Sequence, residues 1–229
     1  MGSEMCIRDR RSFGAAPYFR NMNLCDIHFH ENAEHRGGEF TTYAGNGDGE
    51  GNGTGYKYDG TLTDAELSPL GRTIGEGENG DLEPGDTIEI HFVHSTAQVG
   101  PGPTLATCLN DEIANPQLRV ETVVGVLVND PDAADFTRMA EVVKVNGFFQ
   151  AGEIPYTLGS PTMYAGSTTG PGYNEKGSPF QVTWNVRPKV LKISISSVEA
   201  WLSDNPFEER HAHGVRNLVK ATSLLSPIK

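Results

Sequence analysis

The fold of this chain is decided by the stretch Asp26-Ile27-His28-Phe29-His30-Glu31-Asn32-Ala33-Glu34-His35 and by a second one, Thr87-Ile88-Glu89-Ile90-His91-Phe92-Val93-His94. Both stretches alternate apolar with polar residues and contain many β-branched and aromatic residues, which predicts two β-strands. Side chains two positions apart on a strand point to the same face, so His28 and His30 project together. Five of the seven histidines lie in these two stretches.

The second strand contains the further residues that a metal site needs besides the histidine pair. Glu89 and His91 share one face of it, so His28, His30 and His91 converge if the two strands are neighbours. Three imidazole nitrogens and an open fourth position form the ligand set of a catalytic zinc site. Glu89 can accept the other ring N–H of His91, as carboxylates behind metal ligands do. A lone His-x-His pair is more often structural, but the second strand and Glu89 favour a metal site.

Length and composition predict one mainly β domain. The 229 residues suffice for one sizeable core, and 37% hydrophobic with 21% charged residues is typical of a globular chain. The 27 glycines and 14 prolines suit short strands and many turns. We expect a large twisted β-sheet with a few short helices outside it, formed by residues 21–229 as a single domain.

Residues 1–20 are expected to be a leader outside the core fold. Residues 1–10 lack the apolar core of a signal peptide and resemble a scar of sequence assembly. The net charge of −12 argues against nucleic acid and anionic membranes as partners. No apolar run approaches the ~20 residues of a membrane span. A small anionic substrate remains compatible, because a metal ion dominates its local field.

Further elements follow from periodicity and turn signals. Residues 118–128 predict a strand buried on both faces, because its second half is an almost continuous valine run. Other strands are expected at 180–186 and 190–195, short helices at 63–67, 133–143 and 198–202, and a loop-rich region at 147–179.

The cysteines and a glycine-rich tract leave alternatives open. Cys25 and Cys108 lack a Cys-x-x-Cys partner, so a thiolate zinc site is not expected. They could form a disulfide, which would suit an oxidising compartment, or remain free thiols. The acidic residues of 45–55 could bind calcium, but their spacing does not match the EF-hand and favours an acidic surface loop.

Several motifs in order resemble those of a known enzyme family. His-x-His at 28–30, Glu-His at 34–35 and Glu-x-His-x-Val-His at 89–94 resemble the α-class carbonic anhydrases, as does the later Gly-Ser-Thr-Thr before a Val-Thr-Trp strand. Residues 21–226 as a whole, with Asn-Leu-Cys-Asp-Ile-His-Phe-His and His-Ala-His-Gly-Val-Arg-Asn-Leu, resemble the δ-class enzymes of marine algae and bacteria. The resemblance implies a central mixed β-sheet.

The resemblance also implies a role for individual residues. The zinc ligands would be His28, His30 and His91, with Glu89 holding His91. Thr168 would accept the hydrogen bond of a zinc-bound hydroxide and donate to Glu34, while Thr169 would help to position bicarbonate. The carbon dioxide pocket would have Val93 and Val123 as walls and Trp184 as its floor.

The implied reaction is the reversible hydration of carbon dioxide to bicarbonate and a proton, a lyase activity. Zinc lowers the pKa of its bound water to about 7, so a hydroxide can attack carbon dioxide at neutral pH. The expected location is periplasmic or secreted. A homodimer is compatible with the sequence, which does not determine the oligomeric state.

The chain departs from the α-class pattern near the threonines and in its proton carrier. One residue is missing between Ser167 and Thr168, and the following loop contains Gly170-Pro171-Gly172 instead of paired prolines and a cysteine. No N-terminal histidine matches the α-class proton shuttle. The candidates that remain are His35, His94, His211 and His213, although the last two otherwise read as a surface pair near the chain end.

Two rival interpretations use the same histidines. His28, His30 and Glu34 also have the His-x-His-x-x-x-Glu spacing of cupins, and Pro-Gly-Asp at 84–86 precedes His91. A cupin site would favour iron or manganese, with Glu34 as a ligand. A non-enzymatic, secreted zinc-binding protein would use the three histidines without Thr168 and Glu34.

Overall fold

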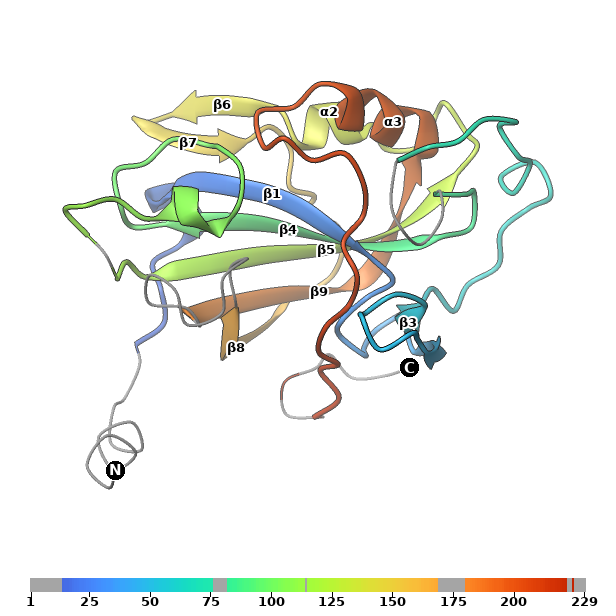
Figure 1. The fold of residues 1–229 in the computed structure, drawn as a ribbon, viewed down its shortest axis with the longest axis horizontal. Coiled ribbons are helices and arrows are strands. Elements are labelled where there is room, and N and C mark those ends of the chain that lie inside the picture. Colours follow the sequence, from blue (N-terminus) through green and yellow to red (C-terminus); the bar gives the residue numbers. More distant parts are fainter. Residues whose placement is uncertain (1–13, 76–81, 114, 169–179, 222–223, 225–229) are drawn as a thin grey trace.

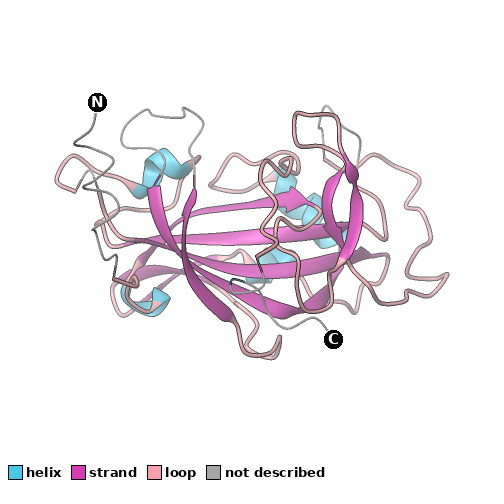
Figure 2. Ribbon diagram, turned by 90° about the horizontal axis from the view of Figure 1, so that it is seen from below, coloured by secondary structure: helices cyan, strands magenta, loops and turns pink. Residues whose placement is uncertain are grey.

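A computed structural model describes residues 14–75, 82–113, 115–168, 180–221 and 224. Its centre is a mixed sheet of five strands in the order β1-β4-β5-β9-β8 (Figure 1). The strands are β1 (Asn23–Glu31), β4 (Thr87–Ser95), β5 (Leu118–Val128), β9 (Phe180–Ser194) and β8 (Thr162–Thr168). The predicted mainly β fold with a mixed sheet is confirmed, and the strands twist strongly when seen from below (Figure 2).

The sheet is antiparallel except at one junction. β1 pairs with β4, β4 with β5 and β8 with β9 in antiparallel registers, whereas β5 and β9 run parallel. β5 has a partner on both edges and every one of its residues is buried. The predicted strand at 118–128 is therefore confirmed, and its valine run reflects its central place in the sheet.

Apolar residues divide between the two faces of the sheet. Ile27, Phe29 and Ile90 belong to the larger core cluster, on the face opposite the histidines. Two helices, α2 (Phe136–Met139) and α3 (Ile195–Ser203), contribute side chains to that cluster. In Figure 1 both lie above the sheet beside the hairpin of β6 (Val142–Val145) and β7 (Phe148–Ala151). The histidine face holds a smaller cluster instead.

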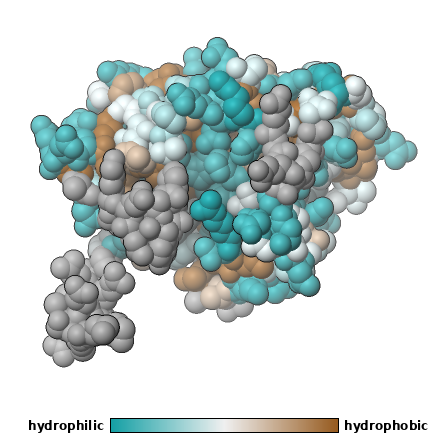
Figure 3. All heavy atoms as spheres, viewed as in Figure 1, coloured by the Kyte–Doolittle hydropathy of each residue, from teal (hydrophilic) through white to brown (hydrophobic). Residues whose placement is uncertain are grey.

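The remaining elements are short. Two 3-10 helices, η1 (Phe19–Asn21) and η2 (Leu105–Cys108), flank the sheet, and β2 (Thr42–Asn46) pairs with β3 (Thr54–Lys57) as a separate hairpin. No helix in the described ranges has the length and apolar character of a membrane span. The surface in Figure 3 is mostly hydrophilic, with apolar residues in separate patches.

The structure corrects several predicted elements. Residues 64–67 form a turn instead of a helix, and the helix expected over 133–143 shrinks to α2 because its second half enters the hairpin as β6. The region expected to be loop-rich contains β7 and β8, since partner strands supply hydrogen bonds that a local pattern does not reveal. The strands expected at 180–186 and 190–195 are one strand, β9.

The expected boundary of the core at residue 20 is too late. Phe19 is 4% exposed and belongs to the larger core cluster, and the amide of Ala16 donates to Thr183 Oγ1 over 2.8 Å. Residues 1–13 lie outside the described ranges. The N-terminal part of the fold therefore includes residues 16–20.

Cys25 and Cys108 form a disulfide with an S–S distance of 2.05 Å. It joins β1 to η2 across 83 residues of sequence, and both cysteines are fully buried. Of the two alternatives left open by the sequence, the structure has the disulfide. The bond anchors β1 on the side that carries the histidines, because both cysteines belong to the smaller core cluster.

We expect the double variant Cys25→Ala/Cys108→Ala to lower the free energy of unfolding by about 4 kcal/mol, because an 83-residue loop is no longer closed in the unfolded chain. Urea denaturation of both proteins without reductant measures the difference. Dithiothreitol should destabilise the unmodified protein and leave the variant unchanged. Equal stability of the two proteins would contradict the disulfide.

Candidate metal centre

Three histidines from the two central strands bring their ring nitrogens together. The register places His28 opposite His91, with His30 two residues further along the same face of β1. One ring nitrogen from each of the three lies within 4.8 Å of the other two. His28 Nε2 and His91 Nδ1 are only 3.2 Å apart. The predicted convergence of His28, His30 and His91 is present.

Each histidine is oriented by an acceptor behind it. Asp26 Oδ2 accepts from His28 Nδ1 over 2.7 Å, and Glu89 Oε1 accepts from His91 Nε2 over 2.8 Å. His30 Nδ1 donates to the backbone carbonyl of Gly214 over 2.9 Å. These bonds leave the other nitrogen of each ring, with its lone pair, for the centre of the cluster.

The arrangement requires a cation between the rings. Two nitrogen lone pairs 3.2 Å apart repel each other unless a proton or a metal ion lies between them. A proton bridges only two atoms, whereas His30 supplies a third nitrogen to the same point. Zinc–nitrogen bonds of 2.0–2.1 Å in a tetrahedron separate the nitrogens by about 3.3 Å. The donor set therefore fits a tetrahedral metal with one position left for a non-protein ligand.

Burial keeps two of the three ligands neutral. It lowers the pKa of His91 to about 4, against the opposing effect of the hydrogen bond to Glu89. Burial and the neighbouring imidazoles also hold the pKa of His30 well below its usual value. For His28, burial is outweighed by the charge and hydrogen bond of Asp26, which raise its pKa. A proton on His28 therefore competes with a metal ion for the same nitrogen.

Glu89 supports two imidazoles at once. Its Oε1 accepts from His91 and, over 2.7 Å, from Nδ1 of His35, while Oε2 accepts the His35 amide. Burial alone would raise the pKa of Glu89, but the imidazole of His35 and these hydrogen bonds hold it far below its usual value. The Tyr164 hydroxyl completes the chain by hydrogen bonding to His35 Nε2 over 2.6 Å. Glu89 thus remains ionised and fixes the ring of His91.

The predicted partners Thr168 and Glu34 lie in different surroundings. Glu34 Oε1 is 3.7 Å from His30 Nδ1, and burial with the charge of Glu89 raises its pKa to about 7. Thr168 ends β8 opposite Phe180, and no hydrogen bond joins it to Glu34 within the described residues. Thr169 and the Gly-Pro-Gly loop lie outside the described ranges. The roles of these residues stay predictions.

Two of the three expected pocket residues lie on the metal face. Val93 and Trp184 belong to the smaller core cluster there, and the Trp184 ring centroid is 4.9 Å from that of His91. The assignment of Val123 is wrong, because β5 pairs it with Ile90 and its side chain packs on the opposite face. The β5 residue paired with Val93, on the same face, is Val120.

The structure separates the four candidate proton carriers. His35 is committed to Glu89 and Tyr164, while His94 is buried on the other face against Phe19, with its pKa lowered by burial to about 4. The ring of His213 lies 5.5 Å from that of His28 and 5.8 Å from that of the exposed His211. The expectation of a mere surface pair is therefore wrong for His213.

The C-terminal segment and the glycine-rich tract hold one another beside His30. In Figure 1 this segment crosses the strands of the sheet, and it pairs His213 with His30. The amide of Val215 donates to Gly51 O over 2.7 Å, next to the carbonyl that orients His30. Gly51 has φ +106°, and a Cβ there would lie 2.9 Å from Val215 O.

The tract 45–55 therefore has a structural role besides being a surface loop. The carboxylate of Asp48 accepts hydrogen bonds from the backbone amides of Glu50 and Asn52, within the loop itself.

Sequence reasoning missed three groups around the metal. Asp26 has the same spacing to His28 as Glu89 has to His91, so the carboxylate two residues before a ligand was a readable signal. Tyr164 was visible only as part of a loop-rich stretch. The Gly214 carbonyl is a backbone group and leaves no signal in the sequence. Only the tertiary structure reveals its contact with His30.

A family model and two solved structures of known proteins are similar to this chain. A family model described as delta carbonic anhydrase matches residues 19–197. An α-carbonic anhydrase of Photobacterium profundum is 14% identical over 90% of this chain and 88% of its own, with a TM-score of 0.29. The α-carbonic anhydrase of Thermovibrio ammonificans, solved with the inhibitor sulfanilamide, is 12% identical over 92% and 86%, with a TM-score of 0.26. No curated protein matches.

Removing the carboxylate behind His91 tests the support that it provides. We expect Glu89→Ala to bind zinc about 10- to 100-fold more weakly, because the His91 ring loses its orientation and basicity. Competition with a chromophoric chelator measures the affinity. Glu89→Gln preserves the volume if the alanine variant is unstable, and the exposed Glu141→Ala is the matched control. Unchanged affinity in both Glu89 variants would exclude this role.

Proposed function

Because the chain belongs to the delta carbonic anhydrase family, we propose that it hydrates carbon dioxide reversibly to bicarbonate and a proton at a zinc ion held by His28, His30 and His91. The single observation that carries this proposal is the convergence of three ring nitrogens, each with its other nitrogen already hydrogen bonded. The protein is a carbonic anhydrase, and the choice of zinc and the detailed roles below are part of the proposal.

The donor set supports zinc over iron or manganese. Three imidazoles carry no charge, and no carboxylate joins their group of ligand atoms in the described residues. Such a set with one open position is typical of catalytic zinc, whereas oxygen-rich sets favour manganese. Zinc held this way keeps its double positive charge and supplies a water that ionises near neutral pH and attacks carbon dioxide.

The cupin alternative requires Glu34 as a ligand, and its position argues against that role. Its Oε1 lies 3.7 Å from His30 Nδ1, the nitrogen that hydrogen bonds Gly214 O and therefore faces away from the cluster. Glu34 also groups with His35 and Glu89, not with the three converging histidines. The zinc-storage alternative would leave the Glu89–His35–Tyr164 chain without a purpose beyond binding. A rigid, single orientation of His91 is instead what a catalytic site needs.

The other residues on the metal face position the reactants. Val93 and Trp184 provide an apolar surface next to His91, suited to carbon dioxide, which carries no charge. In this proposal Thr168 would accept the hydrogen bond of the attacking water and donate to Glu34, which requires the end of β8 to approach Glu34, because no hydrogen bond joins the two residues in the described structure. Thr169, which lies outside the described residues, would hold a bicarbonate oxygen.

The proton leaves along the C-terminal segment in this proposal. His213 lies beside His28, its Nε2 hydrogen bonds Glu209 over 2.7 Å, and His211 stands next to it at the surface. His211 passes the proton to buffer.

The disulfide supports the proposed location. A bond between Cys25 and Cys108 persists in an oxidising environment and is rare in reducing ones. We infer a periplasmic or secreted protein. Fractionation of the native cells, followed by thiol labelling of these cysteines without reductant, tests this location.

Substitutions of His91 and Thr168 should have different effects on zinc content and on the hydration rate. We expect His91→Ala to lose zinc and carbon dioxide hydration together, because two nitrogens do not hold the ion. Thr168→Ala should keep stoichiometric zinc and lose about a hundredfold in rate, as removal of one orienting group typically costs. Stopped-flow hydration and elemental analysis of the same samples provide both readouts. Equal activity of the two variants would refute the assignment.

The proposed proton exit predicts a rate that depends on buffer. His211→Ala should slow hydration by about tenfold in dilute buffer, because positioned proton transfer is lost, with zinc content unchanged. Added imidazole should restore the rate, since a mobile base replaces the missing one. His94→Asn, a change on the opposite face, is the comparison variant. A rate of His211→Ala that equals that of the unmodified protein in dilute buffer would exclude this route.

A further inference from the structure

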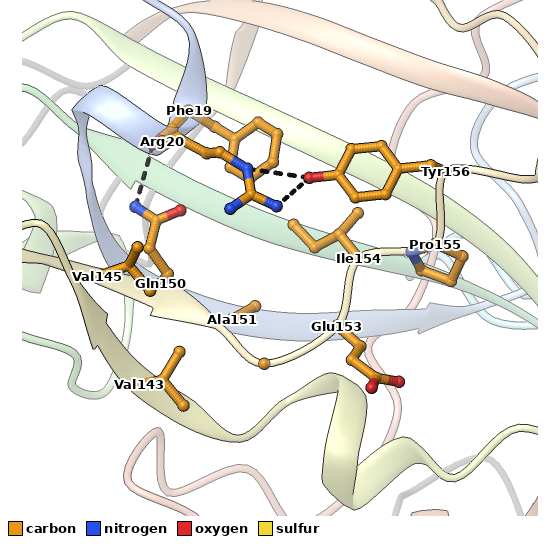
Figure 4. A pocket seen from close by; sticks show the side chains of 11 residues that line it. Phe19, Arg20, Val143, Val145, Gln150, Ala151, Glu153, Ile154, Pro155 and Tyr156 are labelled. Atoms are coloured by element: carbon orange, nitrogen blue, oxygen red, sulfur yellow. Dashed lines mark hydrogen bonds between the residues drawn. The ribbon is translucent and has the colours of Figure 1, made fainter.

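A cavity of about 300 Å³ lies away from the metal, next to the larger core cluster (Figure 4). It is bounded by η1, by the β6–β7 hairpin and by the segment 152–156 that follows the hairpin. Its apolar lining comes from Phe19, Val143, Val145, Ala151, Ile154 and Pro155. Glu153 also lines it, and its carboxylate is paired with Arg138. No metal ligand and no residue of the Glu89 chain lines it, so its role is separate from carbon dioxide hydration.

Arg20 brings a positive charge to one side of this cavity. Its Nε and Nη2 both donate to the hydroxyl of Tyr156, which holds the guanidinium in place (Figure 4). Its carbon atom Cζ also lies 5.6 Å from the ring centroid of Tyr156. A guanidinium has five N–H donors. Some of them remain available after Arg20 has donated to the hydroxyls of Tyr156 and Tyr18. Arg20 has no carboxylate partner among the described residues.

Gln150 supplies an acceptor beside Arg20 (Figure 4). The side chain is 3% exposed, and its Nε2 donates to the carbonyls of Phe19 and Met22 over 3.2 and 2.8 Å. Carbonyls only accept, so these two bonds determine which end of the amide is nitrogen. The oxygen Oε1 is therefore fixed, and it is buried without a partner in the described part of the chain. Figure 4 shows it pointing towards the guanidinium of Arg20.

The two polar groups are complementary to one kind of ligand. The guanidinium recognises a planar carboxylate through paired N–H groups. The unpaired amide oxygen requires a donor, because a buried acceptor left without one is unfavourable. An ammonium donor would lie close to the like charge of Arg20, whereas a hydroxyl is neutral. The apolar walls then accommodate a hydrocarbon group.

We propose that this cavity binds a small α-hydroxy carboxylate with an apolar side chain. The carboxylate pairs with Arg20, the hydroxyl donates to Gln150 Oε1, and the side chain packs against Val143 and Ile154. The proposal uses neither the metal nor the proposed activity, so either can fail without the other.

Isothermal titration of the zinc-loaded protein with 3-phenyllactate tests the proposal. Two related compounds each lack one group, since 3-phenylpropionate has no hydroxyl and 3-phenyl-1,2-propanediol has no carboxylate. We expect saturable binding of phenyllactate and at least about tenfold weaker binding of both analogues, because each loses one hydrogen-bonded group. No binding at about 10 mM phenyllactate, or equal affinity for all three, would overturn the proposal.

Variants locate the binding on the protein. Arg20→Met removes the charge and Val143→Phe fills the cavity, and both should weaken phenyllactate binding at least about tenfold while carbon dioxide hydration is unchanged. Arg72→Met, which changes an exposed arginine paired with Glu199, should bind as the unmodified protein does. Phenyllactate affinity that persists in Arg20→Met and disappears when zinc is removed would assign the binding to the metal and refute the cavity site.

Discussion

The pairing of His28 with His91 across β1 and β4 is the constraint on which the metal centre depends. Side chains alternate between the faces of a sheet, so a slip of one residue between these strands would send His91 to the apolar core. The register is secured because the alternate residues, among them Phe29 and Ile90, are buried in the larger cluster on the other face. The hydrophobic pattern that stabilises the sheet therefore also aligns the ligands.

Charge within the metal face is balanced by hydrogen bonds instead of solvent. Glu89 is fully buried and would be costly as an isolated ion, but it accepts hydrogen bonds from His35 and His91. This compensation keeps the carboxylate ionised, and the ionised carboxylate in turn determines which nitrogen of His91 is free. Asp26 acts in the same way on His28. The outer hydrogen bonds thus orient the three imidazoles.

Both the strands and a segment without regular structure contribute groups to the metal face. The strands provide the spacing of the three imidazoles, while a C-terminal segment without regular structure supplies the Gly214 carbonyl and His213. That segment is held by the tight turn at Gly51. On the other face the sheet is covered by α2, α3 and a hairpin, and the cavity beside Arg20 arises where the hairpin leaves the sheet.

The sequence by itself determined the mainly β fold, the convergence of the three histidines and the contact of Glu89 with His91, because period-two alternation and i, i+2 spacing are local properties of a strand. Tertiary structure alone decided which face Val123 occupies, since a run of valines has no alternation to read. It also decided that Gly214 orients His30 and that His213 reaches the metal face. These contacts join residues more than 180 positions apart, and their energy comes from burial and hydrogen bonding that no local pattern records.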